Sequence, residues 1–423
     1  MNRKEITRQV KDLALSSGFD AVGICSADPL EEERARFLDW LNLGYAGSMS
    51  YLEREPERRL NPRQILPSAK SIIVLALNYF PSQSVIPAQA GIQSLDPRFR
   101  GGDSGQTLGR VAKYARGRDY HKILERRLRL FAAALKEKIE TPFEAKSYVD
   151  AGPVMERPLA RRAGVGFIGK HTLTITRQFG SWVFLSEIIT DLDLEPDRPD
   201  LRDCGSCTKC IEACPTGAIV DEYKLDARKC ISYLTIEHRG KIDPDLREKM
   251  GNWVFGCDVC QDVCPINHHN AKPAAEDDGP TARHRSIERR TDRTAPLDKA
   301  ADRRSAKRRP TGAQPSGGLW LDLEDLLNMR DDGTFYKKFS GTPLTRTKRE
   351  GLVRNAAIAA GNSQTSELIP ALKSIVENDS SEIVKEAATW AVQKISRGTA
   401  CRAPTYMPES DASRQEKRTH SSL

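Results

Sequence analysis

The chain has 423 residues, enough for roughly two or three domains. Hydrophobic residues make up 39% of it and charged residues 29%, as in an ordinary globular protein, and no run of about 18 apolar residues predicts a transmembrane helix. The net charge of +8 allows nucleic-acid binding but does not require it, because much of the excess falls in 283–309, which we predict to be disordered. The N-terminus lacks the apolar segment of a signal peptide, so we expect a cytoplasmic protein.

Residues 1–199 predict a catalytic domain of mixed helix and strand. Apolar periodicity indicates a helix over Ile6–Leu15, and "AVGIC" after it is a short strand. The continuous apolar run "SIIVLALNYF" (71–80) is typical of a strand that is covered on both faces. The Gly- and Pro-rich stretch 85–105 has no periodicity and resembles a translated interspersed repeat, so we interpret it as an insertion.

The second half of this region adds further elements. Residues 120–139 predict an amphipathic helix with a basic outer face, and a strand ends at Val149. A helix over 156–162 and a Gly-rich loop precede the apolar strand 181–191.

The C-terminal part shows a repeat. Residues 352–361 and 383–392 align at a spacing of 31 residues, with another helix between them, which predicts a HEAT-like helical domain over 319–396. The polar segment 271–318 has almost no aromatic residues and predicts a disordered linker or second insertion, and 397–423 a disordered tail.

Eight of the ten cysteines lie between Cys204 and Cys264. "CGSCTKCIEACP" has the C-x2-C-x2-C-x3-C-P spacing of bacterial ferredoxins, in which the fourth cysteine binds the other cluster of a pair. If Cys214 likewise binds the second cluster and Cys264 completes the first, the cysteines form two [4Fe-4S] sites in a ferredoxin-like domain over 200–268. The ligands of the first are Cys204, Cys207, Cys210 and Cys264, and those of the second are Cys214, Cys230, Cys257 and Cys260.

Two alternatives to clusters are zinc sites and disulfides. Structural zinc sites usually use separated C-x2-C pairs, and a reducing cytosol disfavours disulfides. The long segment before Cys204 implies a catalytic domain, yet it has neither a Rossmann G-x-G-x-x-G nor a P-loop, so neither nucleotide-binding fold is indicated.

Three blocks in this order resemble the epoxyqueuosine reductase family: "YVDAGPVMERPLARRAGVGFIGKHTLTI", the cysteine region and "RNAAIAAGN". The resemblance covers roughly 5–82, 107–268 and 319–396. It implies an α+β multidomain protein with a nitroreductase-like cobalamin domain, a two-cluster ferredoxin-like domain and a HEAT-like domain. The implied activity is reduction of the epoxide of epoxyqueuosine, at the wobble position of tRNA, to queuosine.

The resemblance also implies roles for single residues. Reductive opening of an epoxide takes two electrons and a proton for the alkoxide, and Asp150 is the implied proton donor, after a predicted strand. Donation at neutral pH requires an Asp150 pKa well above ~3.9. From the sequence alone, a turn or helix-capping aspartate is the simpler interpretation.

Four further side chains are expected to contact cobalamin together with Asp150: Arg59, Thr174, Ser232 and Asp258. Each has a structural alternative: a solvated charge for Arg59, a strand residue for Thr174, a helix residue for Ser232 and a turn residue for Asp258. Ser232 and Asp258 neighbour cluster ligands, which predicts cobalamin close to a cluster.

For tRNA, two basic stretches are candidates. "RVAKYARGRDYHK" (110–122) alternates basic residues with aromatic ones that can stack on bases. A second group consists of Arg346, Lys348, Arg349 and Arg354. Solvated charge is the alternative for each residue.

Two other functions remain open at this point. A cytosolic reductive dehalogenase acting on a small molecule is the alternative enzyme, and an electron-transfer or scaffold protein is the alternative without its own chemistry. We expect a monomer with no membrane association, and the electron donor stays unidentified.

Overall fold

The computed structural model of the chain describes residues 2–80, 107–270 and 320–400. The predicted insertions at 85–105 and 271–318 lie outside the described residues, as does the tail beyond 400. The helix α16 runs over Glu382–Ala400, so it continues past 396, where we predicted the tail to begin. None of the described helices combines the length and apolar character needed to cross a bilayer.

A four-stranded sheet forms the centre of the N-terminal domain, in the order β1-β2-β7-β4. Its strands are β1 (Ala21–Ser26), β2 (Ser71–Asn78), β7 (Val183–Thr190) and β4 (Ala145–Tyr148), and all neighbours pair antiparallel. Every residue of β2 is buried, which confirms the strand predicted to be covered on both faces.

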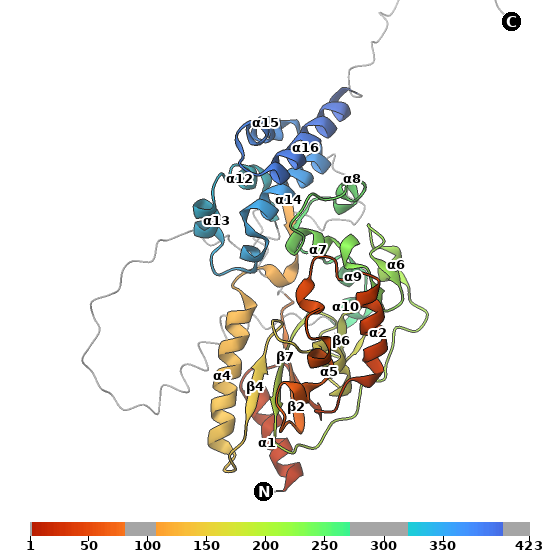
Figure 1. The fold of residues 1–423 in the computed structure, drawn as a ribbon, viewed down its shortest axis with the longest axis vertical. Helices are drawn as coiled ribbons and strands as arrows, with labels where there is room; N and C mark the ends of the chain where they lie inside the picture. Colours follow the sequence, from red (N-terminus) through yellow and green to blue (C-terminus); the bar gives the residue numbers. More distant parts are fainter. Residues whose placement is uncertain (1, 81–106, 271–319, 401–423) are drawn as a thin grey trace, which may run out of the picture.

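Helices cover both faces of this sheet (Figure 1). On one side, α1 (Arg3–Ser16) and α4 (Tyr120–Lys138) share an apolar core with the sheet. On the other side, α3 (Pro56–Leu60) and α5 (Glu156–Arg162) do the same, and α2 (Glu31–Asn42) lies further out. The helix α5 has the bounds that the sequence predicted. The predicted Gly-rich loop contains β5 (Gly166–Ile168), which pairs with β6 (Thr174–Thr176).

The cysteine region is built from short elements. They are α6 (Lys209–Glu212), the hairpin β8 (Ile219–Asp221) and β9 (Lys224–Leu225), α7 (Ile231–Ile236), α8 (Pro244–Arg247), α9 (Val259–Asp262) and α10 (Pro265–Asn270).

A small sheet joins three distant parts of the chain. The strand β3 (Leu108–Val111) pairs on one side with β10 (Trp253–Phe255) and on the other with β11 (Trp320–Asp322). This sheet crosses the three regions that we predicted as separate domains. The active-site, cysteine and C-terminal regions are therefore held to one another by strand pairing.

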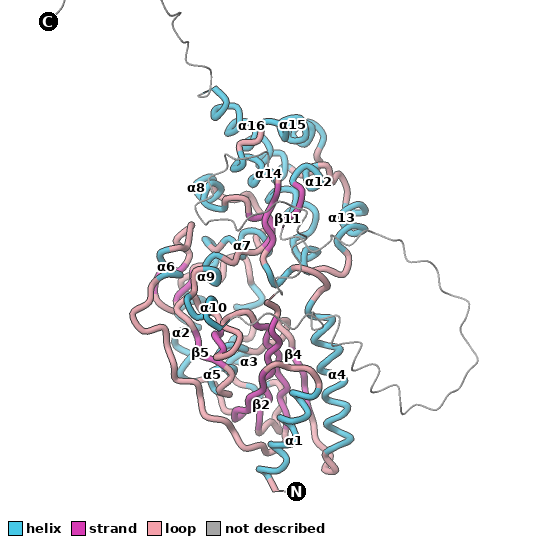
Figure 2. Tube along the Cα trace, turned by 180° about the vertical axis from the view of Figure 1, so that it is seen from behind, coloured by secondary structure: helices cyan, strands magenta, loops and turns pink. Residues whose placement is uncertain are grey.

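Helices make up the C-terminal part, at the end of the molecule opposite the N-terminus in Figures 1 and 2. They are α12 (Leu323–Leu327), α13 (Asp332–Phe339), α14 (Lys348–Ser363), α15 (Ile369–Asn378) and α16. The two aligned sequence segments lie on α14 and α16, which pack against each other. The HEAT-like assignment stays a prediction.

Candidate active site

Asp150 lies in a tight turn directly after the edge strand β4. The Ala151 N–H donates to the Val149 carbonyl across it, and Asp150 has a φ of 53°. Aspartate tolerates this left-handed region better than most residues, although such a conformation still costs about 1 kcal/mol or more. The Asp150 N–H donates to Glu156 Oε1 over 2.6 Å, which ties the turn to the start of α5. The sheet is antiparallel, so the strand-end rule for parallel α/β sheets does not explain this position.

Two side chains from the start of α4 hold the Asp150 carboxylate. The Tyr120 hydroxyl donates to Asp150 Oδ2 over 2.6 Å, and His121 Nε2 lies 3.4 Å from the same oxygen. The other ring nitrogen of His121 is 2.8 Å from Asp119 Oδ1, and Asp119 caps α4. Burial alone would lower the His121 pKa, but the hydrogen bonds to Asp119 and Asp150 raise it to about 9. His121 is therefore cationic at neutral pH.

The same contacts decide the charge of Asp150. Desolvation raises its pKa, but the hydrogen bonds from His121 and Tyr120 outweigh desolvation, so the pKa falls below its usual range. The role of proton donor requires a raised Asp150 pKa, whereas the protein's own contacts lower it, because a cation and a hydroxyl that the sequence did not reveal meet the carboxylate. The Asp150 side chain is 53% accessible, so solvent can reach the carboxylate although desolvation is the largest influence on its pKa.

Two further carboxyl groups, on α5 and β7, respond to the charge of this carboxylate. Burial and the charge of Asp150 raise the pKa of Glu156 to about 7. Glu187 on β7 is fully buried, and its pKa lies well above the usual range because of desolvation and the two neighbouring carboxylates.

The clustered cysteines lie near enough to influence one another's pKa although they are spread over the sequence. Burial raises the pKa of Cys204 and Cys210, and both also respond to Cys207 and Cys264. Cys204 packs beside Cys264 in one apolar cluster, although the two are distant in the sequence.

Burial also raises the pKa of the Cys260 thiol, and the nearby thiols of Cys257, Cys230, Cys210 and Cys214 raise it further. Cys257 responds to Cys230 and Cys214. Because Cys260 responds to Cys210 of the other predicted set as well, the division of the cysteines into two ligand sets stays a prediction. Among the described residues, no three Cys, His, Asp or Glu side chains are placed to hold a single metal ion.

Backbone N–H groups already point at two of these sulfurs. The Ala218 N–H donates to Cys214 Sγ over 3.2 Å, and the Lys170 N–H donates to Cys204 Sγ over 3.5 Å. Such N–H···S hydrogen bonds influence the reduction potential of a cluster.

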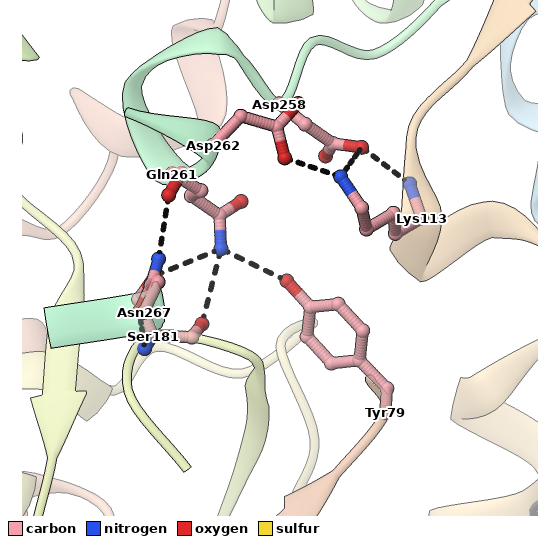
Figure 3. Close-up of polar contacts among 7 residues, drawn as sticks. All are labelled: Tyr79, Lys113, Ser181, Asp258, Gln261, Asp262 and Asn267. Carbon is pink, nitrogen blue, oxygen red and sulfur yellow. Dashed lines mark hydrogen bonds and ion pairs between the residues drawn. The ribbon is translucent and has the colours of Figure 1, made fainter. Parts of the chain in front are cut away.

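Hydrogen bonds attach the segment that carries Cys257, Cys260 and Cys264 to the N-terminal domain (Figure 3). Gln261 Nε2 donates to the Ser181 hydroxyl over 3.0 Å and to the Tyr79 hydroxyl over 3.2 Å. Asn267 Nδ2 donates to the Ser181 hydroxyl and to the Gln261 carbonyl, both over 2.8 Å, and Asn267 Oδ1 accepts from the Ser181 N–H over 2.7 Å. Both amides are almost fully buried, so each contact excludes water.

The opposite side of the same segment binds a lysine (Figure 3). The Lys113 N–H donates to Asp258 Oδ2 over 2.8 Å, and Lys113 Nζ pairs with Asp258 and Asp262. Asp258 is 1% exposed, and its second oxygen has no partner among the described groups.

The other expected cofactor contacts are placed as follows. Arg59 donates from Nη1 to the Gly152 carbonyl over 3.2 Å, beside the Asp150 turn, and from Nη2 to the Tyr51 carbonyl. Burial raises the pKa of Tyr114, and the charges of both Asp150 and Asp258 raise it further, so both carboxylates act on one tyrosine.

Thr174 and Ser232 lie on β6 and α7, and in the described part of the chain neither side chain bonds to Arg59, Asp150 or Asp258. Three expected contacts present a buried polar atom without a described partner: Arg59 Nε, Thr174 Oγ1 and Asp258 Oδ1.

Part of the predicted RNA surface is wrong. Arg349 and Arg354 are 6% and 1% exposed, and both donate to groups inside the protein. Tyr114 and Tyr120 pack against other aromatic rings, and Tyr120 holds Asp150, so neither is free to stack on a base. Arg118, Lys122 and Lys348 are exposed, as that prediction required.

Sequence reasoning missed Glu156 and Glu187 as site residues, and it placed His121 only on an RNA surface. A signal existed for Glu187, because it is the single charged residue inside the apolar run "WVFLSEIIT". A charge in a buried strand is rare unless it is paired or functional.

Comparison with known proteins gives consistent results. Residues 203–267 match a family described as "4Fe-4S double cluster binding domain", and residues 59–151 match one described as "Epoxyqueuosine reductase QueG, DUF1730". The epoxyqueuosine reductase of Vibrio cholerae serotype O1 is 35% identical over 406 residues, which cover 95% of each chain.

Solved structures agree over nearly the same length. A crystal structure of epoxyqueuosine reductase with an epoxyqueuosine-modified tRNA-Tyr stem loop matches with a TM-score of 0.74 and 30% identity, over 93% of this chain and 91% of that one. A structure of the Bacillus subtilis enzyme, described with its catalytic aspartate loop swung out of the active site, matches with a TM-score of 0.73, at the same identity and coverage.

Proposed function

The chain belongs to the epoxyqueuosine reductase family, and we propose that it reduces the epoxide of epoxyqueuosine in tRNA to queuosine, with Asp150 as the proton donor. The observation that carries the role of Asp150 is its accessible position on a turn after β4, with Tyr120 and His121 on one carboxylate oxygen. Removal of the epoxide oxygen as water consumes two electrons and two protons. The protein therefore has to deliver electrons one at a time and to supply protons to the epoxide oxygen.

Two [4Fe-4S] clusters are the proposed electron carriers. The first binds Cys204, Cys207, Cys210 and Cys264, and the second binds Cys214, Cys230, Cys257 and Cys260. The double-cluster family match and the influence of the thiols on one another's pKa support a site with two clusters.

Cobalamin is the proposed group that receives the electrons. When bound, it supplies a low-valent cobalt able to reduce the carbon–oxygen bond. The proposed contacts are Arg59, Asp150, Thr174, Ser232 and Asp258. The buried Nε of Arg59, Oγ1 of Thr174 and Oδ1 of Asp258 support this set, because buried polar atoms without partners are rare and a bound group would satisfy them.

Asp150 starts the reaction as a carboxylate, held by the His121 cation, and must take up a proton before it can donate one. Movement of the turn away from Tyr120 and His121 would release these contacts and raise the Asp150 pKa. The aspartate loop that swings out in the Bacillus subtilis structure supports such a movement. The strained φ of Asp150 also favours an alternative conformation of the turn.

The tRNA is proposed to approach over the start of α4. Arg118 and Lys122 are exposed there and flank Asp119, Tyr120 and His121, so they can meet phosphates while the modified nucleotide reaches Asp150. The proposed enzyme is a cytoplasmic monomer that takes its electrons from a separate reduced donor.

The test is nucleoside mass spectrometry. Reconstituted protein with cobalamin, a strong reductant and epoxyqueuosine-containing tRNA should form queuosine, and about eight irons should bind per chain. Asp150→Asn should keep the iron and the cobalamin but lose at least about 100-fold in turnover. Two zincs without iron would refute the clusters. No conversion alongside activity on an organohalide would favour the small-molecule dehalogenase.

A further inference from the structure

Glu187 is a carboxyl group in the middle of the central sheet without a described hydrogen-bond partner. It is 0% exposed, and neither of its side-chain oxygens accepts or donates a hydrogen bond within the described residues. Its strand pairs on both sides, with Val74 of β2 and Tyr148 of β4 opposite Glu187. An ionised carboxylate in such a place would carry a large desolvation cost, so Glu187 holds its proton at neutral pH.

The strand register shows which way Glu187 faces. Side chains alternate along β7: Ile188 packs in the core with α1 and α4, whereas Leu185 and Ile189 pack in the core with α5. Glu187 shares the face of Leu185 and Ile189. It therefore points toward α5, the helix that begins with Glu156.

Glu156 is hydrogen-bonded to the Asp150 turn, and its charge acts on Glu187 more strongly than that of Asp150 does. Glu156 Oε1 accepts the Asp150 N–H over 2.6 Å, which leaves Oε2 free to carry a proton. Burial and then Asp150 raise the Glu156 pKa, while Arg157 and His121 lower it, and the balance is a value of about 7. The charge of Glu187 also contributes to the raised pKa of Cys25 on β1, after burial and the opposing effect of Arg162. The three carboxyl groups thus form a series, from neutral Glu187 through Glu156 to ionised Asp150.

We propose that Glu156 and Glu187 store protons behind Asp150 and recharge it during each turnover, acting through Asp150 and not on the substrate. The inference rests on the proposed function, in which oxygen leaves as water. Two electrons from the external donor and two protons are consumed, and Asp150 can hold only one proton at a time. Glu156 passes its proton to the Asp150 carboxylate, and Asp150 passes it to the substrate oxygen. Glu187 then protonates Glu156, and the same two transfers deliver the second proton to the oxygen, which leaves as water. Two protons from solvent restore Glu156 and Glu187.

The first test does not require turnover. Infrared spectra of the reconstituted wild-type protein at pH 7.5 should show the carbonyl stretch of a buried protonated carboxylic acid, and Glu187→Gln should remove it. Glutamine has nearly the same shape as protonated glutamic acid and is also neutral, so iron content and thermal unfolding should be retained. A wild-type spectrum without this band overturns the inference.

The second test uses the pH dependence of turnover at saturating tRNA. Wild-type kcat should fall as pH rises through about 7, where Glu156 loses its proton. Glu156→Gln should lower kcat at pH 7 at least about tenfold, abolish this pH limb and leave the KM for tRNA unchanged. Glu140→Gln is the matched control, since Glu140 is exposed beyond the end of α4, and it should behave as wild type.

The outcomes separate the two proposals. A wild-type protein that converts no epoxyqueuosine refutes the proposed function, whereas the infrared band is judged independently of it. A wild-type protein that is active, combined with a Glu156→Gln variant that keeps the wild-type kcat and pH profile, refutes the proton store alone. If Glu187→Gln does not fold, the wild-type spectrum and Glu156→Gln still decide the question.

Discussion

The Tyr120 hydroxyl donates to Asp150 Oδ2 over 2.6 Å, from the first residue of α4 to the turn that ends β4. Burial raises the pKa of Asp150, but the hydrogen bond from His121 and then this bond from Tyr120, which also orients the carboxylate, lower it. The Tyr120 ring stacks on Phe184 with centroids 4.3 Å apart, so the hydroxyl has little freedom to move. Tyr120 therefore controls both the orientation and the charge of Asp150.

Tyr120→Phe should remove a hydrogen bond that stabilises the ionised form of Asp150 by about 1.5–3 kcal/mol. The ring and its stacking remain, so folding should not change. The Asp150 pKa should rise, and the limb of the kcat–pH profile that belongs to Asp150 should move to higher pH. Tyr336→Phe, an exposed tyrosine on α13, is the control and should leave the profile unchanged.

The raised pKa of His121 predicts how its contribution to folding stability depends on pH. Its pKa of about 9 in the folded protein lies above the ordinary ~6.5, so its contribution is fully present below pH ~6.5 and is lost as pH rises through about 9. The pKa values of Asp119 and Asp150 are lowered, so both carboxylates become protonated, and their ion pairs with His121 are lost, only below pH ~4.

His121→Gln should thus lower the melting temperature most near pH 6 and hardly at all near pH 10. Thermal unfolding of both proteins at pH 6, 8 and 10 measures this difference. A difference that grows with pH would contradict the charged state assigned to His121.

The sequence was informative wherever the pattern is local. The periodicity of α1 and α4, the apolar runs of β2 and β7, and the spacing of the cysteines all follow from short segments. The surroundings of Asp150 were not predictable in this way, because Glu187 reaches the site only through the pairing of β7 with β4. The prediction that Arg354 belongs to an RNA-binding surface was wrong for a related reason. Nearly every residue of α14 is buried, and a helix that is buried all round has no solvated face.

Asn267 should control how firmly the cysteine segment is held. Asn267→Leu has nearly the same volume but leaves the Ser181 N–H and the Gln261 carbonyl without their partner, at about 1–3 kcal/mol each. We expect a lower melting temperature and faster loss of iron to a chelator. Asn328→Leu, at an exposed position after α12, should change neither measurement.

Arg354 should act on stability and not on RNA binding. Its guanidinium donates to the carbonyls of Leu234, His238 and Gly240 over 2.7 to 2.9 Å, which fastens α14 to the end of α7. Arg354→Gln leaves these carbonyls without a donor and should lower the free energy of unfolding by at least about 3 kcal/mol. Lys348→Gln is exposed on the same helix, removes the same charge and should leave stability unchanged. Thermal unfolding and stem-loop binding by fluorescence anisotropy measure both effects. If Arg354→Gln kept its stability and lost RNA affinity, the basic surface predicted from the sequence would be restored.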